Sequence, residues 1–288
     1  MDFSLDELQQ GVVDAARAFA RGRLASDAPA WDAARKVPDA VWTELGELGL
    51  LSICVSEAEG GAGLDALALV LVVEELARAS GSVAWGVVLS AEAGARVARA
   101  GDARALQALM DGTRLAQACE EASTSEGRLG LRALPSALTL TPSADSEGSA
   151  ATSLRQVGAA AALVGLADAA TDAALAYAGD RHQFGRPLSA FQAIQFKLAD
   201  ARTRVAAARL LTQRAAASSS SANAAAALAF ASSVAPEVCS ESLQVHGGYG
   251  YTTDFPVERQ LRDATAIALV AASRGRTRAQ LADALLAS

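Results

Sequence analysis

Two short clusters in the second half of the chain combine residue types that suit a ligand with anionic groups and flat rings. The first is Arg181-His182-Gln183-Phe184-Gly185, and the second is Gln244-Val245-His246-Gly247-Gly248-Tyr249-Gly250. An arginine beside a glutamine amide and an aromatic ring fits a pyrophosphate and an adjoining ring system. Adjacent glycines let backbone N–H groups approach a ligand closely. Both clusters therefore indicate ligand binding.

Each cluster also has a purely structural explanation. The first can be an ordinary connection between two helices, with Gly185 at the bend, Ser189 as the N-cap of the next helix and Phe184 covering the seam. The second can be a helix end closed by a glycine C-cap. Taken singly, neither cluster distinguishes a binding site from a helix connection.

Taken together with their flanking residues, the clusters closely resemble the C-terminal helical domain of the acyl-CoA dehydrogenases. The resembling segments there are Arg181 through Gln195, Leu198-Ala199-Asp200, Gln244 through Thr252, Pro256-Val257-Glu258-Arg259 and Arg262-Asp263-Ala264. The first half contributes Leu45-Gly46-Glu47-Leu48-Gly49-Leu50, Gly60-Gly61-Ala62-Gly63 and Glu74-Glu75-Leu76. The resemblance covers about residues 1–120 and 152–271.

Members of this family bind FAD and remove two hydrogens across the Cα–Cβ bond of an acyl-CoA thioester, with a carboxylate taking the α-proton and the flavin accepting the β-hydride. The resemblance implies an N-terminal helical domain over residues 1–120 and a C-terminal helical bundle over residues 152–288. Between them, residues 121–151 are rich in Ser, Thr, Gly and Pro and lose the helical period. We therefore expect an all-α fold in which the family's middle β domain is nearly deleted to a vestigial linker.

The residue that would act as the catalytic base is missing from this sequence. The family motif Tyr-Glu-Gly-Thr reads Val270-Ala271-Ala272-Ser273 here, and the alternative base position, just ahead of Arg155, is Leu154. Neither alanine nor leucine can accept a proton. Glu258 is better explained as a structural ion-pair partner. We expect no catalytic residue in this chain.

The chain keeps the two ligand-binding clusters but lacks the catalytic base and most of the β domain. This combination fits a subunit that completes the FAD site of a neighbouring subunit. In dimers of the family, the β domain and base of one subunit hold the isoalloxazine ring, while Arg-x-Gln-Phe-Gly and Gln-x-x-Gly-Gly reach the pyrophosphate and adenosine half of the neighbour's FAD. The resemblance thus implies that an FAD shared with a catalytic acyl-CoA dehydrogenase paralogue is contacted by Arg181, Gln183, Phe184, Gln244, Gly247 and Gly248. An α₂β₂ heterotetramer follows, with the acyl-CoA bound mainly by the partner.

Substrate and alternative functions stay open. Heteromeric actinobacterial enzymes that trim steroid side-chain CoA thioesters are similar in plan, but the alanine-rich composition identifies no substrate. The chain could instead be a flavin-free helical scaffold that stabilises a relative, or a homo-oligomeric protein that binds acyl-CoA without redox chemistry. Arg274, Arg276 and Arg278 could face an anionic CoA, although a solvated basic helix end explains them better.

Helical periodicity predicts the elements that position these residues. Ser4 and Glu7 form a capping box ahead of a helix over about residues 5–24, and Pro38 and Gly49 bracket a second helix. Further helices are expected over about residues 65–79, 82–100, 103–110, 152–179, 189–217, 223–246 and 257–271, with one more near the C-terminus. In the linker, Leu129 to Ala133 and Leu138 to Leu140 alternate enough for one short hairpin.

Composition agrees with a helical protein and excludes several classes of partner. Hydrophobic residues make up 51% of the chain but aromatic residues only 5%, so the core must be built from Ala, Leu and Val, which favours helices. The net charge of −7 argues against nucleic-acid binding. Three widely spaced cysteines without a CxxC pair predict no metal site and no disulfide framework. Short apolar stretches and an N-terminus unlike a signal peptide predict a cytoplasmic protein with no membrane partner.

Overall fold

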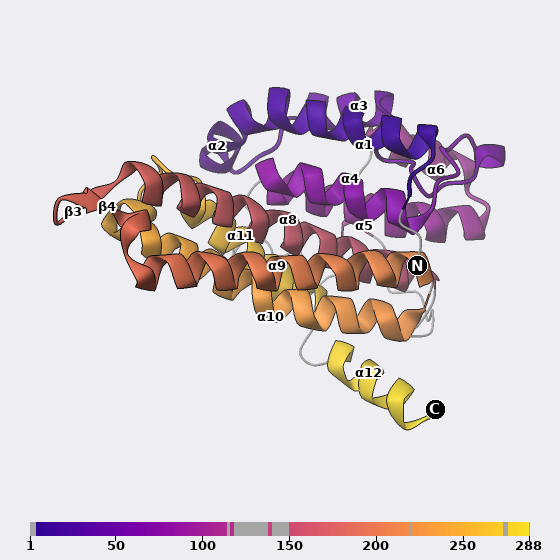
Figure 1. Cartoon of the computed structure of the whole chain (residues 1–288). Helices are drawn as coiled ribbons and strands as arrows, with labels where there is room; N and C mark the ends of the chain where they lie inside the picture. The colour runs from indigo at the N-terminus through magenta and orange to yellow at the C-terminus, as the bar shows by residue number, and fades with distance from the viewer. Residues whose placement is uncertain are drawn as a thin grey trace.

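Helices account for most of the computed structural model, which describes residues 4–113, 116–117, 138–139, 150–218, 220–272 and 276–287. The α-helices are α1 Glu7–Phe19, α2 Ala25–Ala34, α3 Asp39–Glu47, α4 Ala66–Ala79, α5 Gly81–Ala100, α6 Ala103–Met110, α8 Ala150–Asp180, α9 Gln192–Ser218, α10 Ser221–His246, α11 Val257–Ala271 and α12 Arg276–Leu286. The described strands, each of two residues, are β1 Ala116–Gln117, β2 Leu138–Thr139, β3 His182–Gln183 and β4 Arg186–Pro187. The expected all-α class is confirmed (Figure 1).

Helix α8 is the central element of the molecule, and it packs against α4, α5, α9, α10 and α11. Its residues 156–168 are buried without interruption, which small side chains make achievable on every face of one helix. Gly165 shows how close the approach is. A Cβ atom on Gly165 would lie 2.3 Å from the backbone oxygen of Glu74 on α4. The alanine- and glycine-rich sequence therefore permits tight helix contacts.

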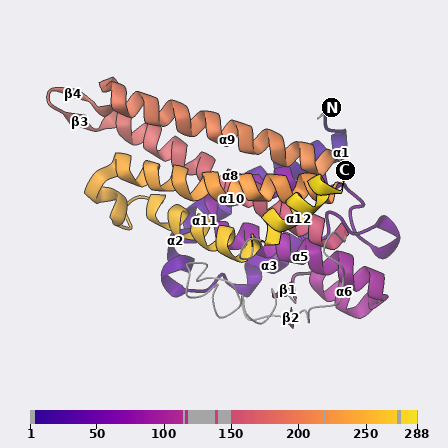
Figure 2. The same ribbon diagram turned by 90° about the horizontal axis from the view of Figure 1, so that it is seen from below.

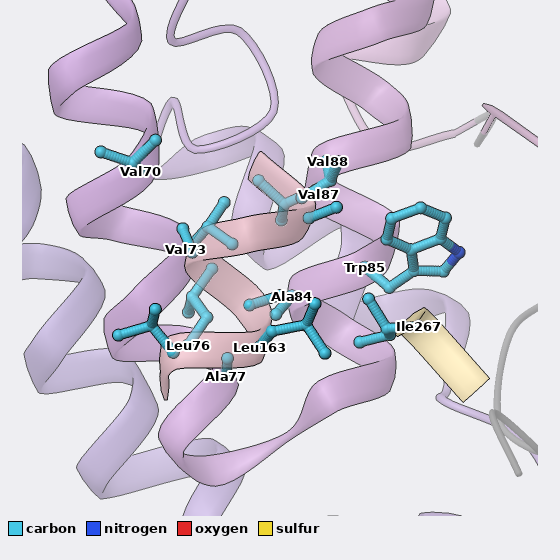
Figure 3. Packing of buried hydrophobic residues seen from close by; sticks show 14 of the residues in the cluster. Val70, Val73, Leu76, Ala77, Ala84, Trp85, Val87, Val88, Leu163 and Ile267 are labelled. Carbon is cyan, nitrogen blue, oxygen red and sulfur yellow. The ribbon is translucent and has the colours of Figure 1, made fainter. Parts of the chain in front are cut away.

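One hydrophobic core joins the N-terminal helices to the C-terminal bundle. Leu163 of α8 lies between side chains of α4 and α5, and Ile267 of α11 lies beside Trp85 of α5 (Figure 3). Trp85, Leu163 and Ile267 are all almost completely inaccessible to solvent. The two helical segments expected from the sequence are thus packed on each other, while their boundaries at residues 1–120, 121–151 and 152–288 stay a prediction.

A network of ion pairs reinforces the contact between α4, α8 and α9. Asp168 of α8 receives Arg78 from α4 and two arginines from α9, with Arg202 Nη1 at 2.5 Å and Arg209 Nη2 at 3.0 Å. The neighbouring Asp172 pairs with Arg78 at 2.6 Å and also with Arg202. Because Asp168 is buried, these charge-assisted contacts satisfy a carboxylate that would otherwise be costly.

The first helix differs from its prediction at both ends. The N-cap is Asp6, whose side chain accepts a hydrogen bond from the backbone N–H of Gln9 at 2.7 Å, so the expected capping box of Ser4 and Glu7 is wrong. After α1 the chain continues through a π turn, η1 Ala20–Leu24, directly into α2, which contains Pro29. The expected end near residue 24 is therefore a change of helical pitch, in a π turn with Gly22 at its centre, and the helical path does not break there.

The strand prediction for the linker is correct for one segment only. Leu138 lies in β2, but β2 pairs in parallel with β1, with Ala116 opposite Leu138. Residues 129–133, the other half of the expected hairpin, lie outside the described residues. In the described part of the segment between α6 and α8, β1 and β2 are the β structure present, which agrees with a nearly deleted middle β domain.

Two helical stretches, Ala150–Asp180 and Ser221–Tyr251, are long and apolar enough to cross a membrane by length and composition alone. Of their most apolar windows, 72% and 50% of the residues are buried inside the protein. Core helices pass the same test, so the two stretches are weak evidence for a membrane span. Packing against neighbouring helices accounts for their apolar composition.

Candidate functional site

The first cluster forms a hairpin that projects beyond the helical bundle at the end where α8 meets α9 (Figures 1 and 2). β3 and β4 are antiparallel, with Gln183 opposite Arg186, and Phe184 and Gly185 form the two-residue loop. Both loop residues have positive φ, 51° and 78°, as a type I′ turn requires. Placing a phenylalanine there costs about 1–2 kcal/mol. The fold therefore keeps an aromatic residue at a position that backbone energetics disfavour.

The ring of Phe184 points into solvent and is 93% exposed. The ring centroids of Phe184 and Phe191 are 6.4 Å apart. The guanidinium carbon of Arg186 lies over the ring of Phe191, 4.1 Å from its centroid. The structural explanation of this cluster is thus correct for Gly185 at the bend and wrong for Phe184 as a seam cover. It is also wrong for Ser189 as an N-cap, because α9 begins at Gln192 and a 3-10 turn, η3 Leu188–Ala190, precedes it.

The second cluster closes α10 and continues as a 3-10 turn, η4 Gly247–Tyr251. Gly247 has φ 60° and ψ −137°, which side chains disfavour, so the C-cap explanation is sufficient for it. Gly250 is needed for packing, since a Cβ there would lie 2.6 Å from the backbone oxygen of Leu243. Gly248 has neither reason: its φ is ordinary, and a Cβ would meet no atom within 4 Å. The open space beside Gly248 is where a ligand can approach the backbone.

The two clusters meet in one open pocket of about 450 Å³. Its lining comes from the end of α8, the hairpin and the end of α10 with η4, and consists of Tyr177, Arg181, Gln183, Leu188, Val245, His246, Gly247, Gly248, Tyr249 and Thr252. Four of the six predicted contacts are therefore brought together: Arg181, Gln183, Gly247 and Gly248. Phe184 and Gln244 are exposed beside the pocket and do not line it.

His246 forms the buried wall of this pocket, which sequence reasoning missed. Its ring stacks on Tyr177 with centroids 4.4 Å apart and meets Phe255 edge-on at 5.0 Å. Nδ1 lies 2.8 Å from the carbonyl oxygen of Ser242, so Nδ1 carries the hydrogen and donates it. Burial lowers the pKa of His246, which keeps the ring neutral near pH 7. No local signal pointed to His246, because the stacking joins residues 177 and 246 of two different helices.

The charges of the pocket suit binding better than proton transfer. Arg181 supplies the formal positive charge among the residues that line the pocket. Its guanidinium lies 5.7 Å from the ring centroid of Tyr249, and this cation–π contact holds the guanidinium at the pocket wall. None of the ten lining residues is a carboxylate. An arginine, a glutamine amide, backbone N–H groups and aromatic rings together fit a ligand that carries phosphate and a flat ring.

Comparison with known proteins identifies the family of the chain. The model of the acyl-CoA dehydrogenase N-terminal domain matches residues 6–112, and that of the acyl-CoA dehydrogenase C-terminal domain matches residues 151–286. The chain belongs to the acyl-CoA dehydrogenase family. Similar proteins include the probable acyl-CoA dehydrogenase YngJ of Bacillus subtilis, 28% identical over 92% of this chain and 94% of the relative. The benzylmalonyl-CoA dehydrogenase of Aromatoleum aromaticum is 29% identical over 91% and 94%.

The solved butyryl-CoA dehydrogenase of Megasphaera elsdenii shows the same fold, with a TM-score of 0.86 at 24% identity, covering 99% of this chain and 100% of that one. The alignment with YngJ runs over 357 positions, more than the 288 residues of this chain. This chain therefore lacks residues that its relative has. Between the two matched ranges, neither family model matches residues 113–150, at the place of the middle β domain.

The remaining candidate residues lie on α8 and α11, away from the pocket. Ala271 is the last residue of α11 and is buried, and Leu154 is half-buried on α8. Glu258 accepts a hydrogen bond from Arg262 at 3.2 Å, so its interpretation as an ion-pair partner is confirmed. Arg262 also binds both carboxylate oxygens of Asp32, at 2.8 and 2.7 Å.

The C-terminal arginines are only partly described. Ser273 and Arg274 lie outside the described residues, and of Arg276 the helical backbone alone is described. Arg278 is exposed on α12.

In the described part of the chain, no three His, Cys, Asp or Glu side chains come together as a metal site would need.

Proposed function

We propose that this acyl-CoA dehydrogenase family member is a non-catalytic subunit that completes the FAD site of a catalytic paralogue. The observation that carries the proposal is the placement of the pocket. Arg181, Gln183 and the pair Gly247-Gly248 converge at the open end of the bundle, beside a projecting hairpin tip. Groups so exposed are accessible to a cofactor held by another chain. The proposed assembly is an α₂β₂ heterotetramer.

The residues of the pocket fit one half of an FAD molecule. Arg181 supplies a guanidinium for the pyrophosphate, Gln183 an amide, and the open backbone at Gly248 an N–H donor that no side chain obstructs. Phe184 and Gln244, exposed next to these groups, would contact the adenosine half from outside the pocket. When bound, FAD supplies the acceptor for the substrate's β-hydride. This chain's own part is to bind and orient the cofactor.

The base for α-proton removal would come from the partner. Side chains at Ala271 and Leu154, the two positions where the family places that base, have no atom that accepts a proton. Residues 113–150 are also too few to build a β domain over the flavin ring in the manner of the longer relatives. On this proposal the acyl-CoA, of the steroid side-chain type or another, binds mainly to the partner. We also propose a cytoplasmic location.

The proposal is tested by co-expressing the chain with a paralogue encoded beside it and measuring flavin absorbance per chain. We expect colourless protein from the chain alone and a yellow complex that holds fewer flavins than chains. Arg181→Ala should weaken flavin retention on dialysis of the complex by about tenfold or more, because it removes a charge-assisted contact. Arg186→Ala is the matched control. It removes the same charge from the same hairpin, at a side chain that does not line the pocket.

Three results would contradict the proposal in different ways. Equal flavin retention by Arg181→Ala and Arg186→Ala would separate the pocket from the cofactor. A stable complex without flavin would favour the helical scaffold. Bound FAD or acyl-CoA in the isolated chain would favour a homo-oligomeric protein.

A further inference from the structure

Three aromatic side chains from three different elements form what we call the ring cluster, which consists of Tyr177, His246 and Phe255. Tyr177 lies in the last turn of α8, His246 ends α10, and Phe255 stands two residues ahead of α11. The ring of Phe255 meets Tyr177 edge-on with centroids 5.3 Å apart, and its centroid is 5.0 Å from that of His246. Tyr177 and His246 line the pocket, but Phe255 does not. Phe255 therefore supports two pocket rings from outside the pocket.

The ring cluster also bears on the arginine of the pocket. The backbone N–H of Arg181 donates a hydrogen bond to the carbonyl oxygen of Tyr177 at 2.9 Å, one helical turn earlier. A displacement of Tyr177 would therefore be transmitted to the guanidinium that is proposed to bind the pyrophosphate.

The place of Phe255 depends on how the first two turns of α11 are held. Glu258 lies in the first turn, and its Oε1 atom accepts a hydrogen bond at 3.2 Å from Nη2 of Arg262, one turn later. Val257, the first residue of α11, is completely buried. A contact that holds Arg262 therefore also holds the start of α11 and the Phe255 ring beside it.

Asp32 of α2 holds Arg262 from the other half of the chain. Nη1 of Arg262 donates to Oδ1 at 2.8 Å and Nη2 donates to Oδ2 at 2.7 Å, which makes the pair bidentate. Such a pair fixes the orientation of both side chains as well as their distance. The side chain of Arg262 is 16% exposed and that of Asp32 is 21% exposed, so salt screens this pair less than it screens a surface ion pair.

Helix α2 is itself anchored in the hydrophobic core. Ala28 and Trp31 are buried there, and Asp32 follows Trp31 directly. The backbone that carries the Asp32 carboxylate is therefore held in place. A continuous series of contacts runs from the core of the N-terminal helices through Arg262 and the start of α11 to the ring cluster.

We propose that Asp32 is a positioning residue for the pocket, which acts through Arg262 and the start of α11 to hold the ring cluster in place. Asp32 is not among the residues that line the pocket, so its part is indirect. The inference rests on the proposed function only for the identity of the ligand, because the contacts between Asp32 and the ring cluster lie within this chain. The N-terminal helices would thus shape a site whose two binding clusters both lie in the C-terminal half.

The positioning role is tested by an NMR titration of the histidine-labelled full chain, alone or in its complex. The sequence contains two histidines, so one signal follows His246 and the other, from His182 in the hairpin, is the reference. Burial lowers the pKa of His246, and a looser ring cluster that admits water should raise this pKa toward the ordinary histidine value. His182→Gln assigns the two signals.

Asp32→Asn keeps the size of the side chain but removes its charge and one of its two acceptor oxygens. We expect the titration midpoint of His246 to rise in this variant, while the signal of His182 behaves as in the wild type. Loss of a negative charge by itself would lower the midpoint, so a rise reports a change in the ring cluster. A midpoint of His246 that stays equal to that of the wild type, or falls below it, would overturn the proposal.

Phe255→Leu shows whether Asp32 acts through the ring cluster. This variant should raise the midpoint of His246 by itself, and adding Asp32→Asn should raise it no further, because both changes loosen the same contact. Additive effects in the double variant would contradict the proposed route. Asp39→Asn is the matched control, since it makes the same chemical change at an exposed aspartate of α3 and should leave the midpoint unchanged.

Flavin retention by the complex measures the consequence for binding. Asp32→Asn should speed the loss of flavin on dialysis by about threefold, which is less than the effect expected for Arg181→Ala. A raised midpoint of His246 with unchanged flavin retention would uphold the positioning role and count against the proposed function. An unchanged midpoint would overturn the positioning role whatever the flavin content of the complex.

Discussion

Among the single residues, Asp263 of α11 has an unusual environment. The residue is 3% exposed, and its Oδ1 atom has no hydrogen-bond partner among the described residues. A Cβ on Gly81, at the start of α5, would lie 2.8 Å from Oδ2 of Asp263. The backbone of α5 is therefore in close contact with this carboxylate. Burial raises the pKa of Asp263 to about 7, against the lowering effect of Arg262 and Arg259. The ionised form is therefore the costly one in the folded protein.

We predict that this carboxyl makes the protein less stable as pH rises from about 4 to about 7. In that window the folded state keeps a proton that the unfolded chain has already released, so folding is progressively opposed. Asp263→Asn has no such proton. Its unfolding free energy relative to the wild type should increase by on the order of 2 kcal/mol between pH 5 and pH 7. Urea unfolding of both proteins at several pH values measures the difference.

The exposed carboxyl of Asp283 on α12 provides the control for this measurement. Asp283→Asn makes the same chemical change at an exposed position, so it should change stability little. Parallel stability curves for Asp263→Asn and the wild type would show that the buried carboxyl is ionised without cost, for instance through the N-terminus of α5.

Among the elements, the contact between α4 and α8 depends on the absence of one side chain. We predict that Gly165→Ala destabilises the fold by about 1–3 kcal/mol, since its methyl group would have to displace the backbone of α4 at Glu74. Gly179→Ala, on the same helix near its end, meets nothing within 4 Å and should stabilise by up to about 1 kcal/mol. Chemical denaturation of both variants checks the pair. A neutral Gly165→Ala would mean that the two helices can move apart freely.

Most helices of this chain could be predicted from the sequence because their ends carry local signals. Asp65 ahead of α4 and Pro38 ahead of α3 mark helix starts, and both observed helices begin one residue later. The π turn between α1 and α2 could not be foreseen, because no local residue signals a change of pitch. The predicted capping residue is wrong because Ser4 and Asp6 both suit that role, and it is Asp6 that forms the capping box, with Gln9.

The site was predicted in its composition but not in its shape. Residue type alone indicates what Arg181 and Gly247 can bind. Two clusters about sixty residues apart could therefore be assigned to one binding site. The hairpin was not expected, because Phe184 is an unfavourable residue for a position with positive φ. His246 was overlooked because its role comes from stacking on Tyr177, a contact between two helices that no local pattern encodes.

At the scale of the whole molecule, the shared core has a consequence for folding. The sequence and the two family models divide the chain into two helical parts, yet Val73 and Leu76 of α4 are buried against Leu163 of α8 (Figure 3). The ion pairs of Asp168 with Arg78 cross the same boundary. Neither part alone would cover its apolar surface, and an exposed face of this size leads to aggregation.

We therefore predict that the full chain unfolds in one cooperative transition, with calorimetric and van 't Hoff enthalpies in agreement. Residues 1–112 and 150–288 expressed separately should each fail to show a sharp transition, whereas co-expression of the two pieces should restore one, because the core of α4, α5 and α8 is rebuilt from both. Two well-separated transitions in the intact chain would show that the parts fold independently. In that case each helical part would have a hydrophobic core of its own. The contact between α4 and α8 at Gly165 would then be a domain interface that can open while both parts stay folded.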